Sequence, residues 1–347
     1  MKLLVTGGCG FIGSNFVRWS LANWAAVKIV VLDKLTYAGN LQSLADLLEC
    51  ARLAVVLGDI ADREAVAGAM RGVDGVINFA AESHVDRSIL DASPFVRTNI
   101  VGTQVLLDVA HELGVPRFIQ ISTDEVYGSL GPTGRFTEQT PLAPNSPYSA
   151  SKAAADLLVR AYVQTHGIPA LVIRSSNAYG PYQFPEKLIP LMIMNALAGE
   201  PMPVYGDGMQ VRDWVHVLDL CAAIGTVFDS GRPGEVYNVG GGNEIANLEV
   251  IRGILGITRA SECLLRFVPD RPGHDRRYAM DHSKLTQELD WRPSRDFTAG
   301  IRETVDWYRA NAAWLRAVRT GEYRDYYERQ YAARLGAGVV AQSRLPT

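Results

Sequence analysis

The chain has 347 residues, of which 48% are hydrophobic and 20% are charged, and these proportions are ordinary for a globular protein. This length suits one large α/β unit, or a core domain with a smaller second lobe. The net charge of -3 and the lack of a basic stripe exclude an electrostatic footprint for nucleic acid, so no nucleic-acid partner is expected.

The cysteines, Cys9, Cys50, Cys221 and Cys263, are scattered, without a CxxC pair or a metal-ligand spacing. We expect them to be reduced thiols, as is typical of the cytosol, and we expect no metal site. The first two residues lead directly into a predicted strand, and no apolar run approaches the ~20 residues that a membrane span needs. The sequence therefore predicts a cytoplasmic protein with no membrane partner.

Short β-branched runs alternate with amphipathic stretches through the first half of the chain. Apolar strands separated by helices predict a parallel sheet covered on both faces, which is a Rossmann-like, doubly wound α/β fold. Ligands of this fold bind beyond the carboxyl ends of the strands. Strands are predicted over Lys2–Thr6, Lys28–Asp33, Leu53–Leu57, Gly75–Phe79, Phe118–Ser122 and Ala170–Arg174, and helices over Gly13–Ala22, Thr98–Leu113 and Ser149–His166.

From about Gly180 the prolines cluster and polar loops become frequent. We expect a core domain over residues 1–178 and a smaller C-terminal α/β lobe over residues 179–331, with segments interleaved between them. The last amphipathic helix of this lobe is predicted over Gly300–Leu315. Residues 332–347 are small and rich in glycine, and we expect them to be a disordered tail.

A glycine turn follows the first predicted strand and opens a helix, with the spacing Gly7-x-x-Gly10-x-x-Gly13. Such a turn lets backbone approach a pyrophosphate closely, at a helix N-terminus that favours negative charge. By itself it also fits a tight turn without a ligand. Asp33 ends the next strand, where a carboxylate accepts hydrogen bonds from ribose hydroxyls and repels a 2′-phosphate. Together these features predict a site for NAD rather than NADP.

Further cofactor contacts are expected where the third and fourth strands end. Asp59 and Ile60 follow the third strand, near the expected adenine edge, and the small Ala80 and Ala81 leave room beside the cofactor. The complete predicted set is Gly7, Gly10, Phe11, Ile12, Gly13, Asp33, Lys34, Leu35, Thr36, Asp59, Ile60, Phe79, Ala80, Ala81, Ser83, Tyr148 and Lys152.

The strand that begins at Phe118 ends in an unusually reactive segment, "STDEVYG", which contains Thr123, Asp124 and Glu125. Adjacent carboxylates repel each other and are expensive to desolvate, so packing gives no reason for them here. Because each raises the pKa of the other, such a pair can supply one protonated and one ionised group. The segment therefore indicates acid–base chemistry, with a solvated turn as the alternative.

Tyr148 and Lys152 lie four residues apart at the start of a predicted helix, so that both side chains share one face. A phenol has an ordinary pKa of about 10 and is a poor base. A nearby ammonium, together with a positive nicotinamide ring, stabilises the phenolate and lowers that pKa. The pair alone is a common coincidence, but with the glycine turn and Asp33 it predicts a catalytic base.

These motifs resemble those of extended short-chain dehydrogenases/reductases that act on nucleotide sugars. More narrowly, "NFAAESHVDRS", "STDEVYG", "SPYSASKA", "YGPYQFPEKLIP", "YGDGMQVRDWVHV" and "DRPGHDRRYAMD" resemble the blocks of dTDP-glucose 4,6-dehydratases. The resemblance runs in order from Met1 to about Tyr331. The adjacent acid and base of "TDE" are the most specific block, since epimerases and decarboxylases of the superfamily lack them at this point.

The resemblance implies a dehydration of a dTDP-hexose in which the cofactor is regenerated. Tyr148, assisted by Lys152, takes the proton of the glucose 4-hydroxyl while NAD⁺ takes hydride from C4. Glu125 then removes the C5 proton, and a protonated Asp124 gives its proton to the departing C6 hydroxyl. Thr123 hydrogen-bonds the C4 oxygen. Hydride returns to C6, which gives a 4-keto-6-deoxy sugar.

The resemblance also implies which residues contact the nucleotide-diphosphate hexose. Cations such as Arg212 and Arg271 suit a diphosphate, although each alone is more often a surface ion-pair residue. The family's second asparagine is replaced by Ala178, which removes one expected polar contact. The implied substrate-binding residues are Ser83, Thr98, Thr123, Asn177, Lys187, Leu188, Pro203, Tyr205, Arg212, Asn247, Arg271 and His274.

Similar enzymes are homodimers that pair the two helices predicted over Thr98–Leu113 and Ser149–His166, and we expect a homodimer here. The sequence leaves open a related activity, such as a UDP-glucose 4,6-dehydratase or a 4-epimerase. A catalytically silent NAD-binding regulator is a further alternative. One methyl group separates thymine from uracil, and its burial changes binding by only ~1 kcal/mol, so the base preference also stays open.

Overall fold

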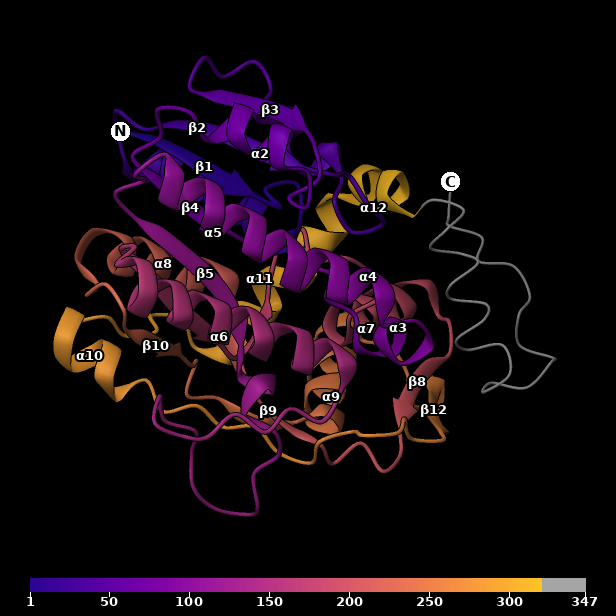
Figure 1. Cartoon of the computed structure of the whole chain (residues 1–347). Helices are drawn as coiled ribbons and strands as arrows, with labels where there is room; N and C mark the ends of the chain where they lie inside the picture. The colour runs from indigo at the N-terminus through magenta and orange to yellow at the C-terminus, as the bar shows by residue number, and fades with distance from the viewer. Residues whose placement is uncertain (320–347) are drawn as a thin grey trace.

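The computed structural model describes residues 1–319. The tail predicted over residues 332–347 and the last residues of the predicted C-terminal lobe lie outside this range. Seven parallel strands form the main sheet, in the order β10-β6-β5-β4-β1-β2-β3 (Figure 1). These strands are β1 (Lys2–Thr6), β2 (Lys28–Asp33), β3 (Leu53–Leu57), β4 (Gly75–Asn78), β5 (Phe118–Thr123), β6 (Ala170–Ser175) and β10 (Val236–Val239).

The bounds predicted for the first three strands are confirmed, while β4 ends one residue early and β5 and β6 each extend one residue further. Every residue of β6 is buried, which agrees with its continuous apolar run. Strand β10 was not predicted; it has four residues and lies far along the chain from its partner β6. The fold itself, a Rossmann-like doubly wound sheet, is confirmed.

Helices cover both faces of this sheet (Figure 1). On one face, α1 (Phe11–Asn23) and α8 (Val217–Ser230) pack together over a core that contains Val5 and Ile119. On the other, α2 (Arg63–Met70), α5 (Thr103–Glu112) and α6 (Pro147–His166) bury apolar side chains against the sheet. Among residues 1–319, no helix is both long and apolar enough to cross a bilayer.

Two of these helices place candidate site residues. Ser146 caps α6, because its hydroxyl accepts a hydrogen bond from the backbone N–H of Ser149, and Pro147 occupies the first turn. The helix therefore begins two residues before the predicted start and includes Tyr148. The predicted helix 98–113 is in fact a π-helix, Val96–Gly102, followed by α5. π-Helical turns are often found at functional sites.

Most residues after Gly180 form a second lobe with its own core, although β10 and α8 belong to the main sheet and its cover. The helix predicted over 300–315 is broken at Asn311 into two helices. The lobe contains β7 (Asn177–Tyr179), α7 (Leu188–Ala198), β8 (Met202–Tyr205), β9 (Val211–His216), β11 (Glu244–Ala246), α9 (Asn247–Thr258), β12 (Leu265–Val268), α11 (Phe297–Ala310) and α12 (Ala312–Val318).

Short helices complete the described part of the chain. They are η1 (Leu41–Leu47), α3 (Val85–Leu90), α4 (Ser93–Phe95), η3 (Asp124–Tyr127), η4 (Glu262–Leu264) and α10 (Ser283–Leu289). The 3₁₀ helix η3 directly follows β5, so the carboxylates of "TDE" lie at the carboxyl end of a central strand. This is where a doubly wound sheet binds its ligands.

Candidate active site

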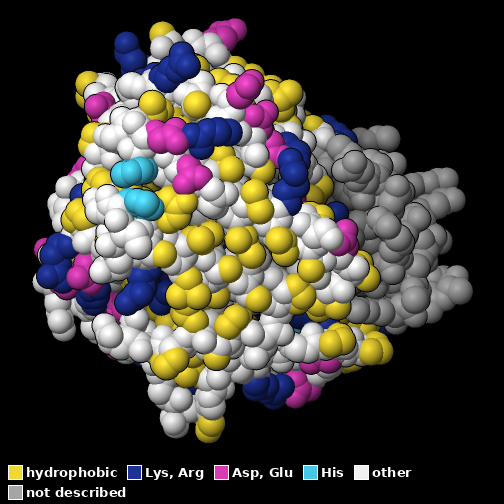
Figure 2. All heavy atoms as spheres, in the orientation of Figure 1, with side chains coloured by type: hydrophobic (Ala, Val, Ile, Leu, Met, Phe, Trp, Pro, Cys, Tyr) yellow, Lys and Arg dark blue, Asp and Glu magenta, His cyan; other side chains and the backbone are white. Residues whose placement is uncertain are grey.

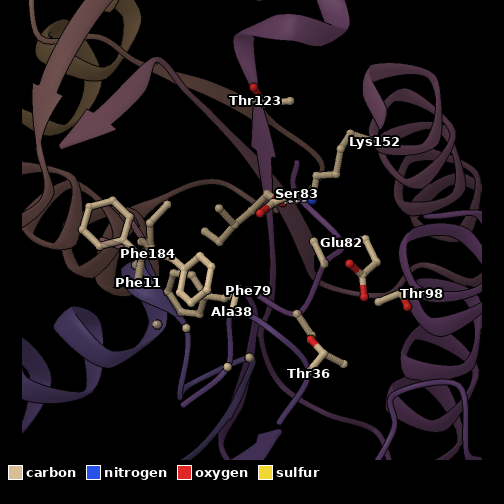
Figure 3. A pocket seen from close by; sticks show the side chains of 18 of the residues that line it. Phe11, Thr36, Ala38, Phe79, Glu82, Ser83, Thr98, Thr123, Lys152 and Phe184 are labelled. Carbon is tan, nitrogen blue, oxygen red and sulfur yellow. Dashed lines mark hydrogen bonds between the residues drawn. The ribbon is translucent and has the colours of Figure 1, made fainter. Parts of the chain in front are cut away.

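A deep pocket lies beyond the carboxyl ends of β1, β2, β4, β5 and β6. Phe11 and Phe184 lie on one side of it, and Glu82, Thr98 and Lys152 lie on the other (Figure 3). All five predicted catalytic residues line this pocket: Thr123, Asp124, Glu125, Tyr148 and Lys152. So do all the predicted cofactor residues except Leu35, whose backbone N–H instead donates a hydrogen bond to Asp33.

The glycine turn approaches its neighbours too closely to admit side chains. Gly7 has a φ of +66°, and a Cβ atom there would lie 2.6 Å from the backbone nitrogen of Ala80. A Cβ atom on Gly13 would lie 2.3 Å from the carbonyl oxygen of Gly7. This turn lines the pocket where α1 begins, so backbone is presented to a ligand at a helix N-terminus.

Asp33 ends β2 and is held in place by backbone. Its Oδ2 accepts a hydrogen bond from the N–H of Cys9 at 2.8 Å, and its Oδ1 accepts one from the N–H of Leu35 at 2.8 Å. Burial raises the pKa of Asp33, and these hydrogen bonds act in the opposite direction. The carboxylate is thereby fixed at the pocket edge with acceptor capacity left for a ligand hydroxyl.

The acid pair of η3 has one member that is almost fully enclosed. Asp124 is 1% exposed, and its Oδ1 accepts a hydrogen bond from the Thr123 hydroxyl at 3.1 Å. Its Oδ2 has no hydrogen-bond partner among residues 1–319. Burial, followed by the negative charge of Glu125, raises the pKa of Asp124 well above its ordinary value. Ser149 donates a hydrogen bond to Oε2 of Glu125 at 3.3 Å. The pair thus presents a carboxyl that favours its protonated form beside a second carboxyl group.

Tyr148 and Lys152 share the buried face of α6, as predicted. Burial lowers the pKa of Lys152 to about 8, and its Nζ donates a hydrogen bond to the carbonyl of Ile121 at 2.6 Å. The pKa of Tyr148 is raised, first by burial and then by the charges of Glu125 and Asp124. The sequence instead predicts a lowered pKa for Tyr148, because of the Lys152 and cofactor charges. The desolvation of the phenol becomes visible only in the folded structure.

The structure divides the residues implied for the substrate into two groups. Ser83, Thr98, Thr123, Asn177 and Lys187 line the main pocket. Leu188 follows Lys187 at the start of α7. The others do not line this pocket and belong to the second lobe: Pro203, Tyr205, Arg212, Asn247, Arg271 and His274.

Several residues of the second group form hydrogen bonds or ion pairs with the carboxylates of Asp86 and Asp270. Arg271 donates a hydrogen bond to Oδ1 of Asp86 at 3.1 Å, and the Tyr205 hydroxyl donates one to Oδ2 at 3.1 Å. His274 pairs with Asp270 at 2.5 Å. Because Asp86 belongs to α3, its contacts join this group to the first half of the chain.

The two groups also lie within electrostatic range of the acid pair. The charge of Glu125 acts on the pKa values of Lys187, Arg212 and Arg271. Three cations, Lys187 before α7, Arg212 on β9 and Arg271 in the second lobe, therefore interact with the charge of Glu125. This arrangement suits a ligand with a diphosphate next to its reacting group.

Sequence reasoning missed some residues that line the main pocket. Tyr37 follows the predicted block 33–36, and Glu186 directly precedes Lys187 in "FPEKLIP", so adjacency to predicted contacts was the available signal. Arg87 connects them, with its guanidinium carbon 3.8 Å from the Tyr37 ring centroid and its Nε 3.2 Å from Glu186. Burial raises the pKa of Glu186 to about 7.

A family model and a curated relative that match this chain both describe nucleotide-sugar 4,6-dehydratases. Residues 4–304 match the family model described as GDP-mannose 4,6 dehydratase. A dTDP-glucose 4,6-dehydratase of Xanthomonas campestris pv. campestris (strain B100) is 53% identical over 341 residues, which covers 92% of this chain and 97% of that protein.

Two solved structures that resemble this chain are nucleotide-sugar enzymes with NAD bound. A dTDP-glucose 4,6-dehydratase from Streptomyces venezuelae with NAD and TYD bound is 51% identical, with a TM-score of 0.90, covering 92% of this chain and all of that one. A UDP-glucose 4-epimerase of Thermus thermophilus in complex with NAD is only 32% identical, with a TM-score of 0.83, covering 90% of this chain and 100% of that one. The chain therefore belongs to the nucleotide-sugar 4,6-dehydratase family of extended short-chain dehydrogenases/reductases, and the resemblance found in its sequence is confirmed.

Proposed function

We propose that this protein catalyses the NAD-dependent dehydration of dTDP-glucose to dTDP-4-keto-6-deoxyglucose. The observation that carries the proposal is the adjacent Asp124 and Glu125 in the pocket that also contains Tyr148 and Lys152. A dehydration needs an acid and a base close together, in addition to the redox pair. Relatives that are about half identical over most of their length carry the same activity in their names.

The residues of the main pocket fit NAD. The glycine turn leaves no room for a Cβ atom at Gly7 or Gly13, which brings backbone N–H groups up to a pyrophosphate. Asp33 would accept hydrogen bonds from the adenosine ribose. When bound, NAD supplies an acceptor for hydride from C4 of the sugar and later the donor of hydride to C6.

Tyr148 is the base that we assign to the 4-hydroxyl proton. Its phenol is buried next to the carboxylates of Asp124 and Glu125, so the phenolate needs positive charge nearby. Lys152 stays largely an ammonium at neutral pH, because its pKa is about 8. An ammonium one helical turn away stabilises developing negative charge on the phenol.

Asp124 and Glu125 divide the elimination between them. Since the pKa of Asp124 is raised well above its ordinary value, this carboxyl is the one suited to hold a proton for the leaving C6 hydroxyl. Glu125 accepts a hydrogen bond from Ser149 and is the base that we assign to the C5 proton. Thr123 is placed to donate a hydrogen bond to the C4 oxygen as charge develops there.

The two lobes bind different parts of the ligands in this proposal. We assign the dinucleotide to residues 1–178 and the nucleotide sugar to residues 179–331, with segments interleaved, since Ser83 and Thr98 of the first part also line the pocket. Lys187, Arg212 and Arg271 are the cations assigned to the diphosphate. We assign a cytoplasmic location because Cys9, Cys50, Cys221 and Cys263 are all unpaired.

A homodimer is also part of the proposal. Apolar side chains gather on the face formed by α5, α6 and the π-helix (Figure 2). Among them, Leu157 is 56% exposed, Val96 48% and Leu113 45%. A second copy of the chain would bury this surface through the same helices.

Incubation of the purified protein with dTDP-glucose and with UDP-glucose, followed by mass and NMR analysis of the products, tests the activity directly. We expect a product lighter by one water, formed faster from dTDP-glucose. A product of unchanged mass that differs at C4 would instead identify a 4-epimerase. No conversion of either compound would leave only the NAD-binding regulator.

Replacing Glu125 with Gln keeps the side chain's shape and removes the base. We expect oxidation at C4, seen as reduced-nicotinamide absorbance in a single turnover, while formation of the 6-deoxy product falls by about 100- to 10,000-fold. The matched variant Tyr148→Phe should lose the oxidation step itself. Rapid 6-deoxy product from Glu125→Gln would contradict the assigned role.

Replacing Asp124 with Asn should stabilise the fold at high pH. A buried carboxyl whose folded pKa is raised binds its proton more tightly when folded, so wild-type stability falls as pH rises above the unfolded pKa of about 3.9. The Asn variant lacks this loss. Its free energy of unfolding at high pH should exceed that of wild type by ~1.4 kcal/mol for each pH unit by which folding raises the pKa of Asp124. Urea unfolding at pH 4 and pH 8 measures the difference. A variant that is less stable at pH 8 than wild type would show that Asp124 is not desolvated.

Replacing Leu157 with Glu should separate the dimer, because a charge would be buried on the apolar face of α6. Size-exclusion chromatography with light scattering gives the mass of the particle. Leu197→Glu is the control, since Leu197 is 40% exposed on α7. A dimeric Leu157→Glu variant would place the interface elsewhere.

A further inference from the structure

A second buried charge network lies behind the active site and does not line the main pocket. Its centre is the ion pair of Arg174 on β6 and Asp156 on α6, which are 6% and 3% exposed. Arg174 Nε donates a hydrogen bond to Asp156 Oδ2 at 2.8 Å. Asp156 lies one helical turn beyond Lys152 and two turns beyond Tyr148, on the same buried face of α6.

The same guanidinium reaches the acid–base turn. Arg174 Nη1 donates a hydrogen bond to the Tyr127 hydroxyl at 2.9 Å, and that hydroxyl donates one to Asn238 Oδ1 at 2.8 Å. Tyr127 is the last residue of η3, two residues after Glu125. In the parallel register Arg174 also lies opposite Ser122, directly before the "TDE" block. The network thus connects α6, β5, β6, η3 and β10.

Stability does not explain these charges. Desolvating two ions costs several kcal/mol each, and apolar side chains of similar size usually replace a buried ion pair at no loss of stability. Such a pair is weak evidence for a stabilising role. Its position between the catalytic helix and the acid–base turn suggests a role in the reaction.

We infer that Asp156 is a positioning residue that holds Lys152 in its ammonium form, and that Arg174 and Tyr127 tie it to the turn that carries the acid and the base. This inference rests on the proposed function, since it assigns a task to residues that serve that reaction.

The surrounding charges support this assignment. Burial lowers the pKa of Lys152, and the charge of Asp156 is the one that opposes it. Burial raises the pKa of Asp156, while Arg174 from β6, Ser122 from β5 and Lys152 act to keep it ionised. On its other side Asp156 lines a cleft with Glu138, Arg160, Glu235 and Lys284, of which the last two pair with each other at 2.7 Å.

The charge of Asp156 determines in which direction the pH–rate profile moves when this residue is neutralised. A negative Asp156 raises the pKa of Lys152 and also that of Tyr148. Removing it lowers both, so the ammonium is lost at a lower pH and the phenolate forms at a lower pH. If activity needs the ammonium and the phenolate, both limbs of the pH–rate profile move in the acid direction. A purely structural defect lowers the rate without moving the limbs.

The test compares Asp156→Asn with wild type, using the pH dependence of dTDP-glucose turnover. We expect both limbs to move by about one pH unit towards acid. NMR titration of the Lys152 ammonium in ¹⁵N-lysine-labelled protein should show the same shift. Asp219→Asn is the matched control, because Asp219 on α8 is also a buried carboxylate and pairs with Arg295 at 2.7 Å. The limbs of the pH–rate profile of this variant should stay in place.

Asp156→Asn leaves Arg174 without its counterion, and this loss can itself unfold the protein. The double variant Asp156→Asn, Arg174→Gln removes both buried charges, and its limbs should move in the acid direction by a smaller amount, because the loss of the Arg174 cation partly offsets the loss of Asp156. Tyr127→Phe keeps both buried charges and removes the hydrogen bonds of the hydroxyl with Arg174 and Asn238. The limbs of its pH–rate profile should not move, and elimination should slow more than C4 oxidation.

Unmoved limbs in the folded single variant or in the double variant would overturn the inference. Equal slowing of both half-reactions in Tyr127→Phe would overturn its second part. These outcomes differ from failure of the proposed function, which would appear as wild-type protein that forms no dehydrated product.

Discussion

The repulsion between Asp124 and Glu125 is the constraint on which the rest of the site depends. Two carboxyl groups at the end of a buried strand favour a state in which one of them keeps a proton. Asp124 is the almost fully enclosed member of the pair, and burial together with the charge of Glu125 raises its pKa well above the ordinary value. In the proposed reaction, these adjacent residues would supply the proton donor and the proton acceptor. The same desolvation works against the phenolate of Tyr148, which explains why the base needs positive charge nearby.

The fold supplies that positive charge from several directions. The sheet brings η3 to its carboxyl edge, α6 places Lys152 beside Tyr148, and the second lobe contributes Arg212 and Arg271. Asp156 opposes the effect of burial on the pKa of Lys152, whereas Arg212 and Arg271 keep their charge at any physiological pH. Neighbours on the same element, such as Glu125 for Asp124 and Asp156 for Lys152, act together with cations from the second lobe.

Much of this could be predicted from local patterns. Strand bounds were accurate where β-branched runs end at glycine or at polar residues, as with β1 to β3, and the pocket contains nearly every residue predicted for the cofactor. Strand β10 escaped prediction because four residues far from their partner carry little signal. The raised pKa of Tyr148 could not be foreseen, since desolvation depends on packing that brings distant elements together. The link from Arg174 to Tyr127 likewise exists only in the folded chain.

In the proposed reaction the sugar is oxidised at C4 so that water can leave across C5 and C6, and the hydrogen taken from C4 then returns to the molecule. The most direct measurement uses dTDP-glucose with deuterium at C4 of the hexose and locates the label in the product by NMR. The account predicts deuterium in the new methyl group at C6. Deuterium that stays at C4, or that is lost to solvent, would contradict it.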